Sequence, residues 1–304
     1  MNYDAILEEI YHEVKPLVGE GHIADYIPEL ARISPQKFGM AVQTIDGEIF
    51  QVGDAAEKFS IQSISKVFTL TMAMQLEGDG LWQRIGREPS GTAFNSLVQL
   101  EYENGIPRNP FINAGALVVA DIILSHLGDA RQSVLDFMHR LCSETDIDFD
   151  HAVAHSERET GFRNAALANF LKSFGNLDND PETVLDAYFH HCSLSMSCIE
   201  VARAGIYLAN GGKLLGNGER IVRANQAKYI NSLMLTCGTY DSVGDFAYRV
   251  GLPGKSGVGG GILAVMPQEF SICTWSPGLN DSGNSLAGTK ALELFTTLTG
   301  ISIF

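Results

Sequence analysis

The two ends of the chain predict β-strands, whereas the long middle predicts helices. Residues 38–52 alternate apolar and polar side chains around Asp46-Gly47, which is a strong signal for a two-residue hairpin turn. Near the other end, further short runs have strand character, at residues 246–252, 257–266 and 270–275. We therefore expect an α/β (α+β) fold, in which an antiparallel sheet formed from both chain ends is flanked by helices and carries a mostly helical insertion.

Helical spacing supports this division of the chain. Residues 3–17 and about 282–298 predict the helices that flank the sheet, and most of the segment between the strands has helical character. We expect one unit over residues 1–304, because its length suffices for a substantial core. Its subdomains are predicted as a sheet part, residues 1–70 plus 241–304, and a mainly helical part, residues 71–240.

Composition and charge exclude several classes of protein. Hydrophobic residues make up 45% of the chain and charged residues 19%, a balance typical of a folded globular protein rather than a disordered one. The net charge of -15 opposes binding to a phosphate backbone, so no nucleic-acid partner is expected. We expect no membrane association, because no apolar run approaches 18 residues, and the acidic first residues lack signal-peptide character. The predicted location is therefore the cytoplasm.

The cysteines and histidines predict neither disulfides nor a metal site. Five cysteines are an odd number and include no Cys-x-x-Cys pair, which favours reduced thiols. The eight histidines show no metal-ligand spacing such as His-Glu-x-x-His. We expect no metal and no cofactor.

Ser63 and Lys66 form a Ser-x-x-Lys sequence at the start of a strongly apolar helix, residues 59–70. Side chains three residues apart share one helix face, so the Lys66 amine can approach the Ser63 hydroxyl. A serine needs a neighbouring base to become a nucleophile, and burial makes lysine a base by lowering its pKa. The alternative reading is a helix-capping serine followed by a lysine that extends to solvent.

A second sequence, Lys255-Ser256-Gly257, lies near the other end of the chain and is followed by Val258 and three glycines. Lys-Ser/Thr-Gly on an edge strand, together with Ser-x-x-Lys, resembles the serine penicillin-recognising enzymes and class A β-lactamases. In such an arrangement the N–H groups of Ser63 and Val258 can hold an oxyanion. A glycine-rich turn is the alternative. The chain lacks the Ser-Asp-Asn sequence of those enzymes, which disfavours a β-lactamase.

A wider set of short sequences resembles the serine-dependent glutaminase family in its bacterial form. The matches run in order along nearly the whole chain: YIPEL at 26–30, QSISK at 62–66, EPSG at 88–91, NAGA at 113–116, SERE at 156–159, CGTYD at 237–241 and KSGV at 255–258. This resemblance implies a β-lactamase/transpeptidase-like fold. It also implies hydrolysis of L-glutamine to L-glutamate and ammonia.

The resemblance also implies a role for each matched residue. Ser63 would attack the side-chain amide carbon, with Lys66 as its base, to form a glutamyl-serine ester. Tyr240 would relay a proton to the leaving ammonia, or else be a buried core tyrosine. The amides of Ser63 and Val258 would hold the oxyanion, and Lys255 would support the site.

The remaining matches are expected to contact the substrate together with Ser63, Tyr240 and Val258: Tyr26, Asn113, Glu157, Asn164 and Tyr188. We assign Glu157 to the α-ammonium group, because a carboxylate pairs with a cation while amides and phenols donate to the α-carboxylate. An acidic loop is the alternative for this segment, and Asn113 is alternatively only a helix-start residue. The family further implies a homodimer or homotetramer. A related amidase, or a non-catalytic glutamine-binding sensor on the same fold, is the alternative function.

Overall fold

The computed structural model describes residues 1–90 and 96–304, so Gly91 of the EPSG sequence lies outside the described residues. Its main sheet is antiparallel and has the strand order β2-β1-β8-β7-β6. The first strand of the chain pairs with the last, with Met40 opposite Thr274. This confirms the predicted mixed fold with a sheet built from both chain ends. The strands are β1 (Gly39–Thr44), β2 (Ile49–Gly53), β6 (Gly254–Ser256), β7 (Gly261–Met266) and β8 (Phe270–Trp275).

The hairpin between β1 and β2 is confirmed, but its turn has three residues rather than two. Thr44 N–H donates to Glu48 at 2.9 Å, and Gly47 N–H donates back to Thr44 at 3.1 Å. Gly47 has φ +94°, a left-handed conformation that glycine adopts without strain. A type I turn followed by such a glycine closes a hairpin as well as the two-residue form does.

The predicted strand at residues 246–252 is wrong, because most of this segment belongs to helix α12 (Val243–Arg249). Phe246 and Val250 are buried, whereas Tyr248 is 89% exposed. A strand would place all three side chains on one face, whereas a helix brings together only residues four apart. Three alternating apolar residues were too few to separate the two patterns.

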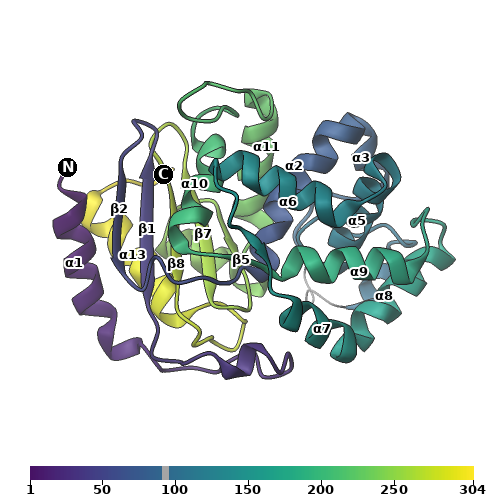
Figure 1. Ribbon diagram of the computed structural model, residues 1–304, viewed down its shortest axis with the longest axis horizontal. Helices are drawn as coiled ribbons and strands as arrows, with labels where there is room; N and C mark the ends of the chain where they lie inside the picture. The colour runs from purple at the N-terminus through teal and green to yellow at the C-terminus, as the bar shows by residue number, and fades with distance from the viewer. Residues whose placement is uncertain (91–95) are drawn as a thin grey trace.

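Helices cover both faces of the sheet (Figure 1). Helices α1 (Tyr3–Val14) and α13 (Leu286–Thr299) lie on one face, where they pack with Met40 and Val42. Helix α10 (Cys198–Ala209) lies on the other face and begins with the capping box of Ser197 and Glu200 that its sequence suggests. Neighbouring strand residues point to opposite faces of the sheet. Ala41, which lies between Met40 and Val42, therefore packs into the hydrophobic core on the α10 side.

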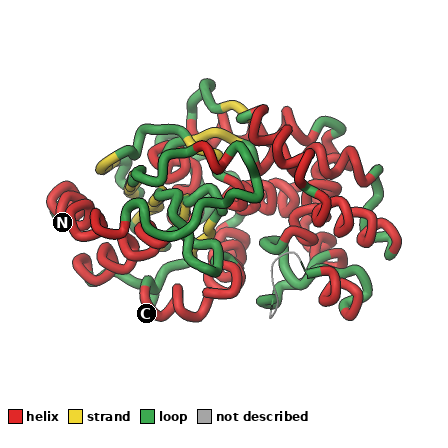
Figure 2. The backbone as a smooth tube through the Cα atoms, turned by 90° about the horizontal axis from the view of Figure 1, so that it is seen from below, coloured by secondary structure: helices red, strands yellow, loops and turns green. Residues whose placement is uncertain are grey.

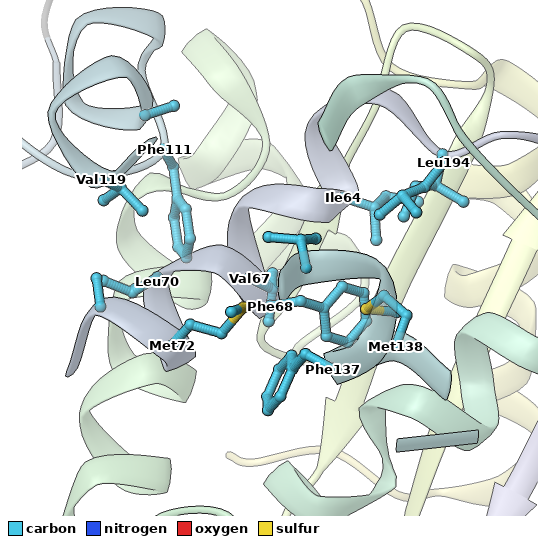
Figure 3. Packing of buried hydrophobic residues seen from close by; sticks show 14 of the residues in the cluster. Ile64, Val67, Phe68, Leu70, Met72, Phe111, Val119, Phe137, Met138 and Leu194 are labelled. Atoms are coloured by element: carbon cyan, nitrogen blue, oxygen red, sulfur yellow. The ribbon is translucent and has the colours of Figure 1, made fainter. Parts of the chain in front are cut away.

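The remaining helices gather beside the sheet, as the view from below also shows (Figure 2). Helix α2 (Ser65–Glu77) runs through their centre, with residues 65–74 all buried. Figure 3 shows Phe68 and Met72 of α2 close to Phe137. Residues 65–74 have no solvent-facing side, so even polar members such as Lys66 and Thr71 are buried. Around it lie α3 (Leu81–Arg84), α4 (Leu97–Tyr102), α5 (Asn113–Leu127), α6 (Ala130–Cys142), α7 (His151–Thr160), α8 (Phe162–Ser173), α9 (Pro181–Cys192) and α11 (Ala224–Cys237).

A small second sheet joins the helices to the start of α2. Its strands are β3 (Phe59–Ser60), β5 (Leu194–Met196) and β4 (Asp148–Phe149), with β5 in the centre. The subdomain boundaries near residues 70 and 240 stay a prediction; α10 lies between them in sequence and packs on the main sheet. In the described part of the chain, no helix combines the length and apolar character needed to cross a membrane.

Candidate active site

A pocket of about 280 Å³ opens where the Ser63 turn meets the ends of several helices. Its lining combines hydroxyl, amide, carboxylate and guanidinium groups, so it is suited to a small polar molecule. The residues that line it are Tyr26, Ile27, Gln62, Ser63, Asn113, Glu157, Thr160, Gly161, Arg163, Asn164, Tyr188, Tyr240 and Val258.

Ser63 lies in a tight turn between β3 and α2. The turn is a short 3₁₀ helix, Gln62–Ile64, and Gln62 has φ +49°, a conformation that is strained for a residue with a side chain. Two buried hydrogen bonds stabilise it. The side-chain amide of Gln62 donates to the Ser60 hydroxyl at 2.9 Å, and this hydroxyl donates to the Cys192 carbonyl at 3.0 Å. The strained turn leaves the Ser63 hydroxyl on the pocket wall.

Lys66 lies beneath the pocket and not on its lining, with only 2% of its surface exposed. Burial lowers its pKa to about 8, although the nearby Cys192 and Glu157 partly oppose this. Its ammonium donates to Asn113 Oδ1 at 2.7 Å and to the Phe111 carbonyl at 3.3 Å. The spacing suggested a contact with Ser63 instead. Because Ser63 belongs to the 3₁₀ turn before α2, the two residues do not share regular α-helical geometry.

Tyr240 follows helix α11 and also has a strained backbone, with φ +54°. Its hydroxyl donates to the Ser256 carbonyl at 3.4 Å, and the Ser63 side chain is close enough to lower its pKa. Burial raises the pKa of this phenol to about 12, so the group is protonated at neutral pH. The tyrosine is therefore placed to exchange a proton with the Ser63 hydroxyl.

Lys255 is fully buried under the Tyr240 ring, and its Nζ lies 4.7 Å from the ring centroid. It donates to the Ser256 carbonyl at 2.6 Å. Burial, reinforced by the charge of Lys66, holds its pKa well below the usual range. Like Lys66, it supports the pocket from behind and is not part of the lining.

The glycine-rich segment after Lys255 packs directly against the Ser63 turn. A side chain on Gly257 would lie 2.6 Å from the Ile61 carbonyl oxygen and 3.2 Å from the Ser63 nitrogen. A side chain on Gly259 would overlap the Ser60 carbonyl. These glycines therefore allow the backbone at Val258 to approach Ser63, and both residues line the pocket.

The opposite wall is formed by the helices. Asn113 is the first residue of α5, and its amide donates to Asn164 Oδ1 of α8 at 2.9 Å. Glu157 comes from α7, and burial raises the pKa of its carboxyl to about 7, despite a hydrogen bond from Gln62 and the charge of Lys66. At this pKa a bound cation would shift the group to its ionised form.

Two tyrosines complete the predicted set. Tyr188 of α9 is buried, its ring centroid lies 5.7 Å from the Lys66 Nζ, and burial raises its pKa. Tyr26 is 56% exposed and lies at the rim of the pocket. The structure thus brings every predicted contact residue to one pocket, while the roles assigned to them stay predictions.

Five lining residues were not predicted: Ile27, Gln62, Thr160, Gly161 and Arg163. Gln62 precedes Ser63 in the QSISK sequence, and its position beside the nucleophile was the available signal. Ile27 lies within the YIPEL sequence, and residues 160, 161 and 163 lie between the SERE sequence and Asn164. Nothing in the sequence marks these four as pocket residues. All five cysteines are buried free thiols. Among the described residues, no group of three His, Cys, Asp or Glu side chains is placed to hold a metal ion.

The fold and the pocket define a protein of the β-lactamase-like class with a serine, a buried lysine and a tyrosine at its site. Comparison with known proteins narrows the class. Residues 21–304 match the family model described as Glutaminase. The chain belongs to the glutaminase family.

Individual relatives agree with this assignment. A glutaminase from Ralstonia nicotianae is 59% identical, and one from Paraburkholderia phytofirmans is 57% identical, each over the full length of both chains. The solved structure of probable glutaminase ybaS is 36% identical, with a TM-score of 0.91 and coverage of 99% of this chain and 98% of that one. A probable glutaminase from Bacillus subtilis in complex with 6-diazo-5-oxo-L-norleucine is 31% identical, with a TM-score of 0.89 and coverage of 100% and 98%.

Proposed function

We propose that this chain hydrolyses L-glutamine to L-glutamate and ammonia through a glutamyl ester on Ser63. The observation that supports the proposal most is that Ser63 and Tyr240 line one small polar pocket, close enough for Ser63 to lower the pKa of the Tyr240 phenol. A nucleophile held by a proton-exchanging group, in a chain of the glutaminase family, fits hydrolysis of a side-chain amide.

In the acylation step, neutral Lys66 accepts the Ser63 proton while the oxygen attacks the amide carbon. The pKa of about 8 leaves a useful neutral fraction of Lys66 near neutral pH. The oxyanion accepts hydrogen bonds from the amides of Ser63 and Val258. Tyr240 passes a proton to the leaving nitrogen and regains one from the Lys66 ammonium, so the C–N bond breaks with release of ammonia and Lys66 is neutral again. Water then attacks the ester as it gives a proton to Lys66, and Lys66 returns a proton to the Ser63 oxygen as L-glutamate leaves.

Recognition falls mainly to the helical wall. The ionised Glu157 carboxylate pairs with the α-ammonium of glutamine, while the Asn164 amide and the phenols of Tyr26 and Tyr188 donate to its α-carboxylate. Asn113 has a double role, because its Oδ1 accepts from Lys66 while its amide faces Asn164. A free α-amino acid is the substrate that fits this combination of charges.

We further propose that the protein is cytoplasmic, is a homodimer or homotetramer, and serves to supply glutamate. The family resemblance supports the assembly, and the five buried free thiols fit the reducing environment of the cytoplasm. Size-exclusion chromatography with light scattering tests the assembly, and a monomer at assay concentration would contradict it.

Ammonia release from L-glutamine by the purified protein tests the function. L-Asparagine, D-glutamine and the Ser63→Ala variant serve as controls. Release from L-glutamine alone, lost in Ser63→Ala, is the expected result. Comparable release from L-asparagine would favour a related amidase, and glutamine binding without ammonia release would favour a sensor.

A further inference from the structure

The Tyr240 hydroxyl reaches Ser63 from a backbone segment that other parts of the chain hold in place. On the preceding side, the Gly238 carbonyl accepts from Ser256 N–H at 3.2 Å. A side chain at Gly238 would overlap the Gly254 carbonyl, so the end of α11 lies tightly against β6. The next carbonyl, that of Thr239, accepts from the Asn284 side-chain amide at 3.2 Å.

Asn284 belongs to a rigid loop between β8 and α13. Its N–H donates to Asn280 Oδ1 at 3.0 Å, and its carbonyl accepts from Asn280 N–H at 2.8 Å. The next residue, Ser285, caps α13 and donates to the Ser276 carbonyl at 2.7 Å. The loop also borders the tyrosine itself, since a side chain on Gly283 would lie 3.7 Å from the Tyr240 ring. Asn284 is therefore a fixed donor aimed at the peptide before Tyr240.

The remaining polar atom of this side chain is unusual. Asn284 is 2% exposed, and its Oδ1 has no hydrogen-bond partner among the residues that the structure describes. Buried polar atoms are normally paired, and an unpaired one destabilises the fold. Reversing the amide would not relieve this, because it would bring Oδ1 against the Thr239 carbonyl oxygen. The stability of the fold does not explain an asparagine at this position. The need for a side-chain N–H that donates to the strained turn does explain it.

We infer that Asn284 is a positioning residue for Tyr240: its amide fixes the Thr239 carbonyl and so keeps the Tyr240 backbone in the left-handed conformation that directs the hydroxyl to Ser63. The inference rests on the proposed function, in which Tyr240 carries a proton. The only other donor to the Thr239 carbonyl among the described residues is the Ser242 N–H at 3.1 Å, which belongs to the same short turn and moves with it. Without the Asn284 bond nothing outside the turn holds this carbonyl, so the turn can relax toward an ordinary φ, which moves the hydroxyl away from Ser63. Asn284 does not line the pocket, so substrate affinity should depend on it little.

The test is the Asn284→Ala variant, assayed for kcat and KM with L-glutamine alone and in a Tyr240→Phe background. We expect kcat to fall about 10- to 100-fold, the loss typical of a misplaced reacting group, while KM changes less than about threefold. In the Tyr240→Phe background the same substitution should cost almost nothing further, because the hydroxyl that it positions is gone.

Asn231 provides a matched control. It is a buried asparagine in α11 that donates to the Leu208 carbonyl at 3.1 Å and also has an unpaired Oδ1. Asn231→Ala should therefore destabilise the fold about as much as Asn284→Ala, as measured by thermal unfolding, yet leave kcat unchanged. If Asn284→Ala fails to fold, Asn284→Ser removes the same long-reaching donor with a smaller loss of volume.

Two results would overturn the inference. One is a folded Asn284 variant with wild-type kcat; the other is an equal loss of kcat with and without the Tyr240 hydroxyl, which would indicate a general structural effect. Failure of the proposed function is distinguishable, because it would show as no ammonia release from L-glutamine by the unmodified protein.

Discussion

The two walls of the pocket are built in different ways. We call the turns that carry Ser63 and Tyr240 the turn wall, and the helices that carry Asn113, Glu157, Asn164 and Tyr188 the helix wall. On the turn wall, Gln62 and Tyr240 have φ values of +49° and +54°. The helix wall consists of residues within regular helices, at the start of α5 and inside α7, α8 and α9.

This difference separates chemistry from recognition. Strained turns persist only where surrounding contacts determine them, and they cluster at active sites, where the strain is part of the mechanism. Helices supply several polar groups at a fixed spacing, which suits the recognition of a small polar molecule. Changes on the turn wall should therefore act mainly on kcat, whereas changes on the helix wall should act mainly on KM. Lys66 joins the two walls, because it follows Ser63 by three residues in the chain and donates to Asn113.

The largest effect is expected for Lys66→Met, which removes the base and keeps an unbranched side chain. Ammonia release should fall about 10⁴-fold or more, as when a catalytic unit loses its base. Replacing a buried, poorly compensated charge with an apolar side chain should not lower the free energy of unfolding. Steady-state assay and thermal unfolding measure both effects. Wild-type turnover in this variant would remove Lys66 from the base role.

A smaller loss is expected for Tyr240→Phe, which keeps the ring and removes the hydroxyl. Losing one general acid–base group should lower kcat about 10²- to 10³-fold while KM changes less than about tenfold. A rise in KM with unchanged kcat would contradict the division between the walls, since it would make Tyr240 a recognition residue. Steady-state assay of ammonia release, with L-glutamine varied, separates the two outcomes.

On the helix wall, Glu157→Gln should raise KM for L-glutamine about 10- to 100-fold, because a charge-assisted bond to the α-ammonium is lost. Its effect on kcat should be smaller. Glu159→Gln is the matched control, because Glu159 is exposed on the same helix and does not line the pocket. An unchanged KM in Glu157→Gln would show that the carboxylate is not the partner of the ammonium.

The pH dependence gives the most specific effect, which is a change in the slope of the pH profile. Glu157, with a pKa of about 7, must be ionised to bind the substrate, and Lys66, with a pKa of about 8, must be neutral to act as a base. Both requirements make kcat/KM rise with pH and level off above about 8. Below pH 7 the slope should approach two, about 100-fold per pH unit. In Glu157→Gln the slope should fall to one, and an unchanged slope would contradict the assignment.

On both walls the sequence reveals which residues are present but not the conformation of the backbone. Ser63, Tyr240 and Val258 were predicted from short sequences that resemble those of a known family, as were the residues of the helix wall. The strain at Gln62 and Tyr240 was not, since a positive φ at a residue other than glycine is imposed by distant contacts. The bond from Lys66 to Asn113 was missed for a similar reason. It joins two residues of different helices that are 47 positions apart in the sequence.

Local patterns were sufficient for most of the fold but not for all of it. The hairpin at Asp46-Gly47 and the strand at residues 270–275 have clear turn signals and apolar runs, and the structure confirms them. The strand expected at residues 257–266 is confirmed only from Gly261, because residues 257–260 form a turn in which Gly260 N–H donates to the Gly257 carbonyl at 2.9 Å. The segment at residues 246–252 was assigned as a strand because it is short and alternating. Burial of Phe246 and Val250 on one side of a helix decides its conformation, and that burial depends on the tertiary packing.

The most direct test of the central claim is detection of the glutamyl ester itself. The protein is mixed with L-glutamine, quenched in acid within one turnover, digested and examined by mass spectrometry. The account predicts one added glutamyl group on the peptide that contains Ser63, and no adduct in Ser63→Ala. Ammonia release with the adduct on another residue, or undiminished turnover in Ser63→Ala, would contradict it.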